Sequence, residues 1–362
     1  MTNSKSMTDQ SHLDFLSAAG WAGADARPLA GDASTRRYLR VSRNGNDAVL
    51  MIAPPGAESA PCPPEANVAE RRQLGYNATA RLAGPNLNAF VAIGNALRAA
   101  GLSAPEIYAA DAKLGLALIE DLGDSLFARV VDTVDETEIY SAATDVLAAM
   151  RAQPPARPAT PDYTMLDYDN AALLAETELL VDWYWPLMKD GPASDDLKTE
   201  YVEIFSGLLK KISPPHSLVL RDFHAENLLW LPDRKDVKRV GLIDFQDGLF
   251  GAAAYDLVSL LEDARRDVAP DLAAAMVDHY CEAARNAGDF DHDAFSHDYA
   301  LLAAQRNAKI LGIFARLAKR DNKPRYLDLL PRVEAHFRND LKRPGMEPLH
   351  RFVTAHLPEL AS

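Results

Sequence analysis

In the stretch "LVLRDFHAENLLWL" (Leu218–Leu231), apolar segments at the two ends enclose a polar loop. The loop carries four polar residues besides Arg221, namely Asp222, His224, Glu226 and Asn227. A buried strand does not normally contain so many polar groups, since burial of an unpaired polar side chain is costly. The stretch therefore indicates a functional loop between two strands.

A second apolar segment, Val240 to Ile243, ends at an acid in "LIDFQDG". The spacing of Asp222 and Asn227 sets a carboxylate and an amide across a tight loop, and Asp244 ends the second strand. Carboxylate and amide oxygens from two strand ends suit Mg²⁺, which leaves Asp222 to orient and deprotonate a hydroxyl, as phosphoryl transfer requires. The alternative is a pair of capped turns, in which Asp222 and Asn227 only satisfy backbone amides.

Length and composition limit the class of protein. The chain has 362 residues, enough for two domains or lobes. Its net charge is 38 − 52 = −14, which argues against nucleic acid as a partner. Two distant cysteines, Cys62 and Cys281, are typical of reduced thiols in a cytoplasmic protein, and neither a signal peptide nor a membrane-spanning run is evident. We expect a cytoplasmic monomer.

The order of the predicted elements gives the fold class. Strands dominate before about residue 122, and helices dominate after it, so we expect an α+β protein with two lobes. A small N-terminal antiparallel sheet lobe would occupy residues 1–121, and a larger, mainly helical C-terminal lobe residues 122–362. Residues 54–84 lack clean periodicity and are interpreted as a long loop or irregular insertion with one short helix. Helical periodicity predicts helices over 136–151, 170–189, 195–211, 272–287, 293–319 and 326–342.

The segments "LRDFHAENLL" and "LIDFQDGLFGAAAYDL" together resemble the catalytic and metal loops of the aminoglycoside and choline phosphotransferase families, which are relatives of protein kinases. The resemblance implies a protein-kinase-like fold that uses ATP and Mg²⁺. It also implies that Asp222 is the catalytic base and that Asn227 and Asp244 are the metal ligands. Asp247 matches a second acid after the metal ligand, and Asp256 matches an acid that braces the loops.

The resemblance extends to the nucleotide site. "LAGDASTRRYLRV" is similar to the hairpin that covers the phosphates, where Ser34 and Thr35 would donate hydrogen bonds. Arg36 and Arg37 would alternate across a strand, so only one of them would face the nucleotide; a solvated arginine face is the alternative. "IEDLG" falls where the lobe linker is expected, and its backbone would bind adenine through Glu120, Asp121 and Leu122.

One departure concerns the third strand, which presents a lysine to the phosphates in this fold and here has Met51. The following helix, from Asn88, also lacks a glutamate to pair with such a lysine, and a lone buried glutamate would be costly. Either an arginine of the hairpin supplies the charge, or the chain is a nucleotide-binding pseudokinase. The intact acids of the two loops favour activity.

Further segments, among them "VLMIAPP", "VDWYWP" and "DARRDV", look like the anomeric N-acetylmuramate/N-acetylglucosamine kinases of bacterial peptidoglycan recycling. The resemblance implies a sugar kinase that acts on the anomeric hydroxyl, for cell-wall recycling towards UDP-N-acetylmuramate. The alternative is a phosphotransferase for a cationic molecule such as an aminoglycoside or choline.

A sugar needs planar apolar support and several polar partners. Trp183 could stack on the ring, although a core role is the commoner use of such a residue. Arg306, at helical spacing from Lys309 and Arg316, would suit the carboxylate of N-acetylmuramate, and a basic surface stripe is the alternative. The predicted substrate site comprises Glu176, Asp182, Trp183, His224, Asp247 and Arg306.

Overall fold

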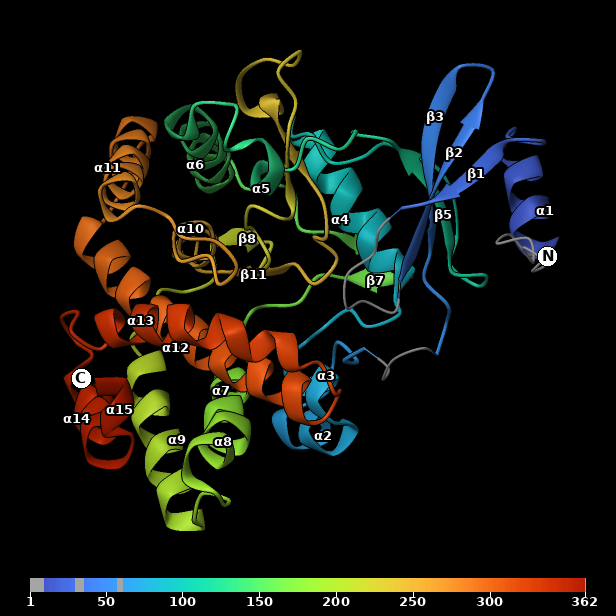
Figure 1. The fold of residues 1–362 in the computed structure, drawn as a ribbon. Coiled ribbons are helices and arrows are strands. Elements are labelled where there is room, and N and C mark those ends of the chain that lie inside the picture. The colour runs from blue at the N-terminus through green and yellow to red at the C-terminus, as the bar shows by residue number, and fades with distance from the viewer. Residues whose placement is uncertain (1–9, 30–35, 57–60, 362) are drawn as a thin grey trace. The chain divides into compact units, whose positions relative to one another are not determined.

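The computed structural model describes residues 10–29, 36–56 and 61–361, whose helices and strands are labelled in Figure 1. The chain forms two compact units. The first comprises Met1–Arg129, Pro155–Met165 and Asn227–Gly248, and the second comprises Val130–Pro154, Leu166–Glu226 and Leu249–Ser362. The predicted N-terminal lobe thus lies within the first unit, which also takes in two later segments.

The first unit is built on a five-stranded antiparallel sheet with the strand order β1-β2-β3-β5-β4. Its strands are β1 (Asp25–Pro28), β2 (Arg37–Arg43), β3 (Asn46–Ile52), β4 (Ile107–Asp111) and β5 (Leu116–Glu120). Asn44 and Gly45 both have positive φ (52° and 79°) in the β2–β3 turn, the conformation that a tight two-residue hairpin favours. The hairpin that "RNGND" predicts is confirmed.

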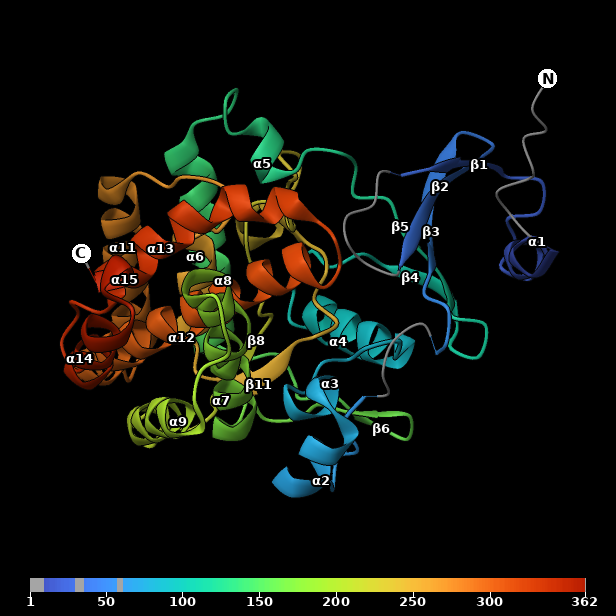
Figure 2. The ribbon, with the colours of Figure 1, turned by 60° about the horizontal axis from the view of Figure 1, so that its bottom comes forward.

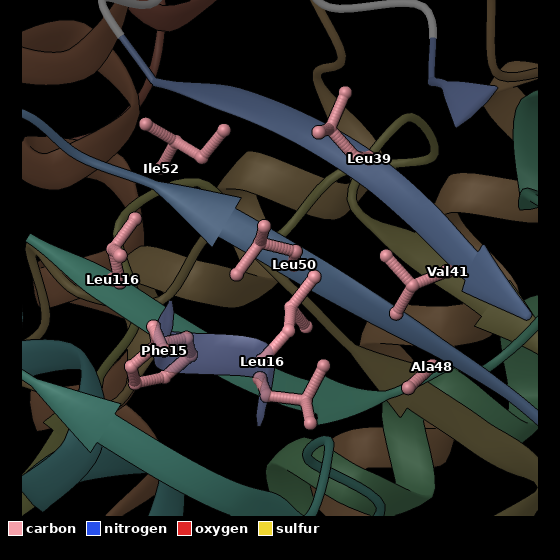
Figure 3. Close-up of a cluster of buried hydrophobic side chains, with 9 residues drawn as sticks. Phe15, Leu16, Leu39, Val41, Ala48, Leu50, Ile52 and Leu116 are labelled. Carbon is pink, nitrogen blue, oxygen red and sulfur yellow. The ribbon is translucent and has the colours of Figure 1, made fainter. Parts of the chain in front are cut away.

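Alternation along the strands gives this sheet two distinct faces. Leu39 and Val41 of β2 and Leu50 of β3 pack with Phe15 and Leu16 of α1 (Gln10–Ala18) into a buried apolar cluster (Figure 3). Because successive side chains of a strand point to opposite sides, the residues between them belong to the other face. That second face therefore carries Tyr38, Arg40 and Met51.

The described part of the 54–84 segment has one helix more than the loop with a short helix that the sequence suggested. It contains two short helices, α2 (Val68–Leu74) and α3 (Tyr76–Thr79). Arg71, which is 1% exposed, joins them by donating from Nη2 to the Thr79 carbonyl at 2.6 Å. Few apolar residues contribute to these helices, so the pattern along the sequence gave little sign of them.

The remaining elements of the first unit are short, apart from the helix α4 (Leu87–Ala99). Two hairpins come from later in the chain: β6 (Ala159–Thr160) with β7 (Tyr163–Thr164), and β9 (Leu228–Trp230) with β10 (Val240–Leu242). The β9–β10 hairpin is tied to the loop after α4, because Leu242 N–H donates to the Ser103 carbonyl at 2.9 Å.

The second unit is mainly helical, which confirms the α+β class with strands early and helices late. Its longest helix, α12 (His292–Lys319), packs against α7 (Asn170–Leu179) and α13 (Leu330–Asp340), which are labelled in Figure 2, and against α10 (Ala254–Leu261). A two-stranded sheet of β8 (Ser217–Val219) and β11 (Leu249–Gly251) precedes α10. The other helices are α6 (Glu136–Ala152), α7 (Asn170–Leu179), α8 (Trp185–Lys189), α9 (Asp195–Leu209), α10 (Ala254–Leu261), α11 (Pro270–Ala287), α13 (Leu330–Asp340), α14 (Glu347–His356) and α15 (Pro358–Ala361).

Three details differ from the helices expected from the sequence. The predicted helix over 170–189 is interrupted by a π-helical turn, Leu180–Tyr184, between α7 and α8. The predicted helix over 326–342 begins only at Leu330, after a 3-10 turn. Helix α10 was not predicted, because it is short and all eight of its residues are buried, including its two polar residues, Asp256 and Ser259.

Candidate active site

The β9–β10 hairpin brings the two predicted metal ligands together. Leu228 pairs with Leu242, and Ile243 N–H donates to the Asn227 carbonyl at 3.2 Å. Asn227 directly precedes β9, and Asp244 follows β10 after one residue, so both lie at the same end of the hairpin. Both are half-buried, which leaves part of each residue accessible to a ligand.

The loop after β10 fixes the position of Asp244. Asp244 has a φ of 57°, a conformation that is unusual for a residue other than glycine. Its Oδ1 accepts a hydrogen bond from Gln246 Nε2 at 2.8 Å. The next residue, Phe245, is fully buried and stacks on Phe90 of α4, with ring centroids 4.9 Å apart. Gly94 allows this approach, because an added Cβ there would lie 3.2 Å from the ring of Phe245.

The second face of the sheet lies within electrostatic reach of Asp244. Burial and the negative charge of Asp244 raise the pKa of Tyr38 to about 12, and the positive charge of Arg36 opposes them. Met51 is paired with Tyr38 across β2 and β3 and is 1% exposed. Met51 thus occupies a closed apolar position, without a lysine, on the side of the sheet whose Tyr38 is within electrostatic reach of Asp244.

The two hairpin arginines differ in their surroundings. Arg36 precedes β2, is half-buried, and donates from Nη2 to the Gly84 carbonyl at 2.9 Å. Arg37 is the first residue of β2 and is exposed. The expectation that both alternate within one strand is corrected accordingly, since only Arg37 belongs to the strand. The predicted phosphate-binding residues Ser34 and Thr35 lie outside the described residues.

The predicted linker is braced by charged side chains. Arg40 of β2 forms ion pairs with Asp121 and, at 2.8 Å, with Asp124. Glu120, the last residue of β5, accepts a hydrogen bond from Arg234 at 2.6 Å. The side chains of Glu120 and Asp121 thus form ion pairs within the protein. Only the backbone of these two residues and of Leu122 would be available to bind a nucleotide. The analysis of the sequence missed Arg40, although its alternation with Tyr38 assigns it to this face.

In the second unit, the backbone before Asp222 is held by a buried acid. The N–H groups of Leu220 and Arg221 donate to Asp256 at 2.6 and 2.9 Å. Burial raises the pKa of Asp256 to about 7, although the two backbone donors lower it. Arg221 has a φ of 72°, and Asp222 itself is half-buried. Asp256 therefore braces the loop, as the resemblance to known kinases implies.

His224, predicted to contact the substrate, is 4% exposed. Burial lowers its pKa to about 4, and the negative charge of Asp263 opposes this shift. Its Nε2 lies 3.4 Å from Nη1 of Arg265, which also forms an ion pair with Glu226 at 2.9 Å. His224 is thus a buried, neutral member of the loop, and Arg265 is the more exposed cation beside it.

The other predicted substrate residues do not form one cluster. Asp182 is exposed and pairs with Lys198 at 2.6 Å, while Trp183 is half-buried in the π-helical turn. Arg306 is 4% exposed and donates to the Glu262 carbonyl. The idea of a basic surface stripe on α12 does not hold for Arg306, because that side chain is buried.

Asp247 and Glu176 both have partners inside the protein. Asp247, in the first unit, accepts a hydrogen bond from Ala83 N–H at 2.6 Å and thereby anchors the end of the 54–84 segment. Glu176, in the second unit, is fully buried and pairs with Arg221 and Lys309. With no exposed surface, Glu176 is placed to act on the protein's own loop rather than directly on a ligand.

The first unit has a small antiparallel sheet and the hairpin that brings Asn227 and Asp244 together, and the mainly helical second unit holds the Asp222 loop. These features define a kinase-like phosphotransferase. The chain belongs to the phosphotransferase enzyme family, whose profile matches residues 25–294. No helix in the described ranges is both long and apolar enough to cross a membrane.

Similar proteins agree with this assignment. A relative from Caulobacter vibrioides, named N-acetylmuramate/N-acetylglucosamine kinase, is 42% identical over 95% of this chain and 95% of its own length. A relative of the same name from Pseudomonas putida is 28% identical over 95% and 93%. Among solved structures, an aminoglycoside phosphotransferase described as putative, from Ralstonia eutropha, is 16% identical and gives a TM-score of 0.59 over 91% and 97% of the two chains. A choline/ethanolamine kinase family protein from Mesorhizobium loti gives 0.57 over 98% and 99%, at 14% identity.

Proposed function

We propose that this protein is an ATP-dependent kinase that phosphorylates the anomeric hydroxyl of N-acetylmuramate, N-acetylglucosamine or both, for cell-wall recycling towards UDP-N-acetylmuramate. The observation that carries the proposal is the 42% identity, over nearly the whole of both chains, to a relative with that name. The two solved neighbours, described as a choline/ethanolamine kinase family protein and a putative aminoglycoside phosphotransferase, are only 14% and 16% identical to this chain, so they do not favour an aminoglycoside or choline as the substrate.

Asp222 is proposed as the catalytic base. The anomeric oxygen attacks the γ-phosphorus, the bond from that phosphorus to the β–γ bridging oxygen breaks, and ADP leaves. Asp222 accepts the hydroxyl proton, and its loop is held by the two backbone hydrogen bonds to Asp256. A base within hydrogen-bonding reach of the attacking hydroxyl typically accelerates such a step by about 10²–10⁴-fold.

Asn227 and Asp244 are proposed to hold Mg²⁺. One amide and one carboxylate fit this ion, because Mg²⁺ keeps several waters and phosphate oxygens and needs few protein ligands. When bound, the ion neutralises charge on the phosphates. The hydrogen bond from Gln246 orients the carboxylate of Asp244 for this role.

The nucleotide is proposed to bind the first unit. The backbone of Glu120, Asp121 and Leu122 would contact adenine, and Ser34, Thr35 and one hairpin arginine would contact the phosphates. Arg36 is the better placed arginine, because it is half-buried and lies within electrostatic reach of Tyr38, as Asp244 does.

The substrate residues stay proposals, with Trp183 and Asp182 as candidates for direct contact with the sugar. We further propose that the protein acts as a monomer in the cytoplasm, on a small amino sugar and without nucleic acid or membrane partners. A boundary near residue 121, between an N-terminal lobe that binds the nucleotide and a C-terminal lobe that binds the substrate, is also part of this proposal.

A coupled assay of ADP release tests the proposal. Wild-type protein, ATP and Mg²⁺ are combined with N-acetylmuramate, N-acetylglucosamine, kanamycin or choline. We expect turnover with one or both amino sugars, and loss of about 10²–10⁴-fold in Asp222→Asn. Asp271→Asn, an exposed acid in the first turn of α11, is the matched control and should keep full activity. Turnover of Asp222→Asn within a few-fold of wild type would exclude Asp222 as the base, and absence of turnover in wild type would favour a pseudokinase.

A further inference from the structure

Arg221, the residue directly before the proposed base, has a backbone conformation that does not suit an arginine. Its φ of 72° lies in the left-handed region, which costs about 1–2 kcal/mol for a residue with a side chain. Glycine would adopt this conformation without strain. A strained arginine persists where surrounding contacts over-determine it, and such strain gathers at functional sites.

The side chain of Arg221 makes those contacts in the interior of the second unit. It is 1% exposed, and its Nη2 donates to Glu176 Oε1. Its guanidinium also lies over the ring of Tyr168, at 4.8 Å from the centroid. The backbone of the same residue is held by Asp256, so both parts of Arg221 are fixed.

Glu176 is the centre of this arrangement. Its carboxylate accepts hydrogen bonds from the Tyr168 hydroxyl and, at 3.1 Å, from Gln305 Nε2, and Lys309 Nζ lies 2.9 Å away. Burial would raise the pKa of Glu176, but the charges of Lys309 and Arg221 lower it to about 2. The acid is therefore ionised at neutral pH, with each oxygen occupied by partners inside the protein.

Lys309 links this group to the second support of the loop. Its Nζ also lies 3.2 Å from the hydroxyl of Tyr255, the residue before Asp256. Tyr255 in turn packs edge-on against Tyr168, with ring centroids 5.2 Å apart. The ion pairs and the backbone brace thus form one closed network around the residue that precedes Asp222.

We propose that Glu176, Lys309 and Tyr168 are positioning residues, which hold Asp222 in its catalytic orientation by clamping Arg221. The proposal rests on the proposed role of Asp222 as the base. A buried ion pair is weak grounds for stability, because desolvation offsets much of the attraction. Orientation of a reacting group is a different matter, since a displacement of about 1 Å can cost about 10²-fold in rate.

The test compares two tyrosines of the second unit that are both buried and both donate one hydrogen bond. Tyr168→Phe removes a donor to the Glu176 carboxylate, whereas Tyr201→Phe removes a donor to the backbone carbonyl of Thr177 and leaves that carboxylate untouched. Both variants should lose similar stability in thermal unfolding. We expect kcat to fall by about 5–20-fold in Tyr168→Phe, at unchanged KM for ATP and sugar, and to stay within 2-fold in Tyr201→Phe.

Two charge variants extend the test. Lys309→Met should lower kcat by about 10²-fold and Lys309→Arg, which keeps the charge, should restore most of it. Equal effects of Tyr168→Phe and Tyr201→Phe on kcat, or full kcat in Lys309→Met, would overturn the proposal. Asp222→Asn in the same assay separates the two claims. If Asp222→Asn is inactive while the Tyr168 and Lys309 variants keep full kcat, only the positioning role fails; if Asp222→Asn is active, the proposed base fails.

Discussion

Removal of the Arg36 guanidinium should impair catalysis far more than removal of its neighbour Arg37. Arg36 is half-buried and its charge, like that of Asp244, affects the pKa of Tyr38, whereas Arg37 is exposed at the first position of β2. Met51 occupies the lysine position, so the proposed phosphate charge has to come from another residue of this face. Arg36 is the described arginine best placed to supply it.

The expected loss in Arg36→Ala has two parts. A missing donor to the transferring phosphoryl group costs about 2.7–4 kcal/mol of transition-state stabilisation, or about 10²–10³-fold in kcat. The lost hydrogen bond to the Gly84 carbonyl affects stability by about 1 kcal/mol, which thermal unfolding measures separately. Arg37→Ala should change kcat/KM for ATP by less than about 3-fold, because an exposed side chain loses little on truncation.

The measurement is the steady-state kcat/KM for ATP in the two alanine variants. Arg36→Lys is the control that retains the charge. Met51→Lys completes the series, and it should not raise activity, because it places an ammonium at a closed apolar position that is 1% exposed. Full activity in Arg36→Ala, an equal loss in Arg37→Ala, or a large gain in Met51→Lys would each refute the reasoning.

The other predictions concern the metal, pH and packing. Asp244→Ala should abolish Mg²⁺-dependent ATP binding in calorimetry and Asn227→Ala should weaken it less, since only the former removes a charge; equal Mg·ATP affinity in wild type and Asp244→Ala would contradict this. Since burial lowers the pKa of His224 to about 4, its contribution to stability is fully present above about pH 6.5 and is lost as the pH falls towards 4. In urea unfolding, the free energy of unfolding of His224→Gln should therefore fall less between about pH 6.5 and 4 than that of the wild type. The same pH dependence in both proteins would contradict this prediction. Gly312→Ala should destabilise by about 1–3 kcal/mol, because its Cβ would overlap the backbone of Leu179, while Gly207→Ala, in open space on α9, should stabilise by about 0.5–1 kcal/mol. Thermal unfolding that ranked the two variants in the opposite order would show the packing argument to be wrong.

The sheet unit and the two polar loops could be predicted because their signals are local. Alternation of apolar and polar residues reveals β2 and β3, and Asn44 and Gly45 mark the turn between them. Asp244 directly follows the apolar segment Val240 to Ile243. The pairing of Asn227 with Asp244 follows from strand ends that meet in one hairpin. Each of these features depends on residues within about twenty positions of one another.

The partners of Glu176 could not be predicted because they lie in distant segments of the sequence. Its partners Arg221 and Lys309 are 45 and 133 positions away in the sequence. Lys309 is at helical spacing from Arg306 and Arg316, a pattern that is also typical of a basic surface stripe. Helix α12 is packed by neighbours on most sides, so the polar residues Gln305, Arg306 and Asn307 in its middle are buried. Periodicity reports an exposed face only where a helix has one.

The most direct test of the proposed function identifies the position of the transferred phosphate. Wild-type protein is incubated with ATP, Mg²⁺ and N-acetylmuramate or N-acetylglucosamine, and the product is examined by phosphorus NMR and by a reducing-sugar assay. A phosphate on the anomeric oxygen locks the ring, so the proposal predicts a sugar 1-phosphate that has lost its reducing end, formed by wild type and not by Asp222→Asn. A phosphorylated sugar that keeps its reducing end, or phosphorylation of kanamycin or choline in place of either amino sugar, would contradict it.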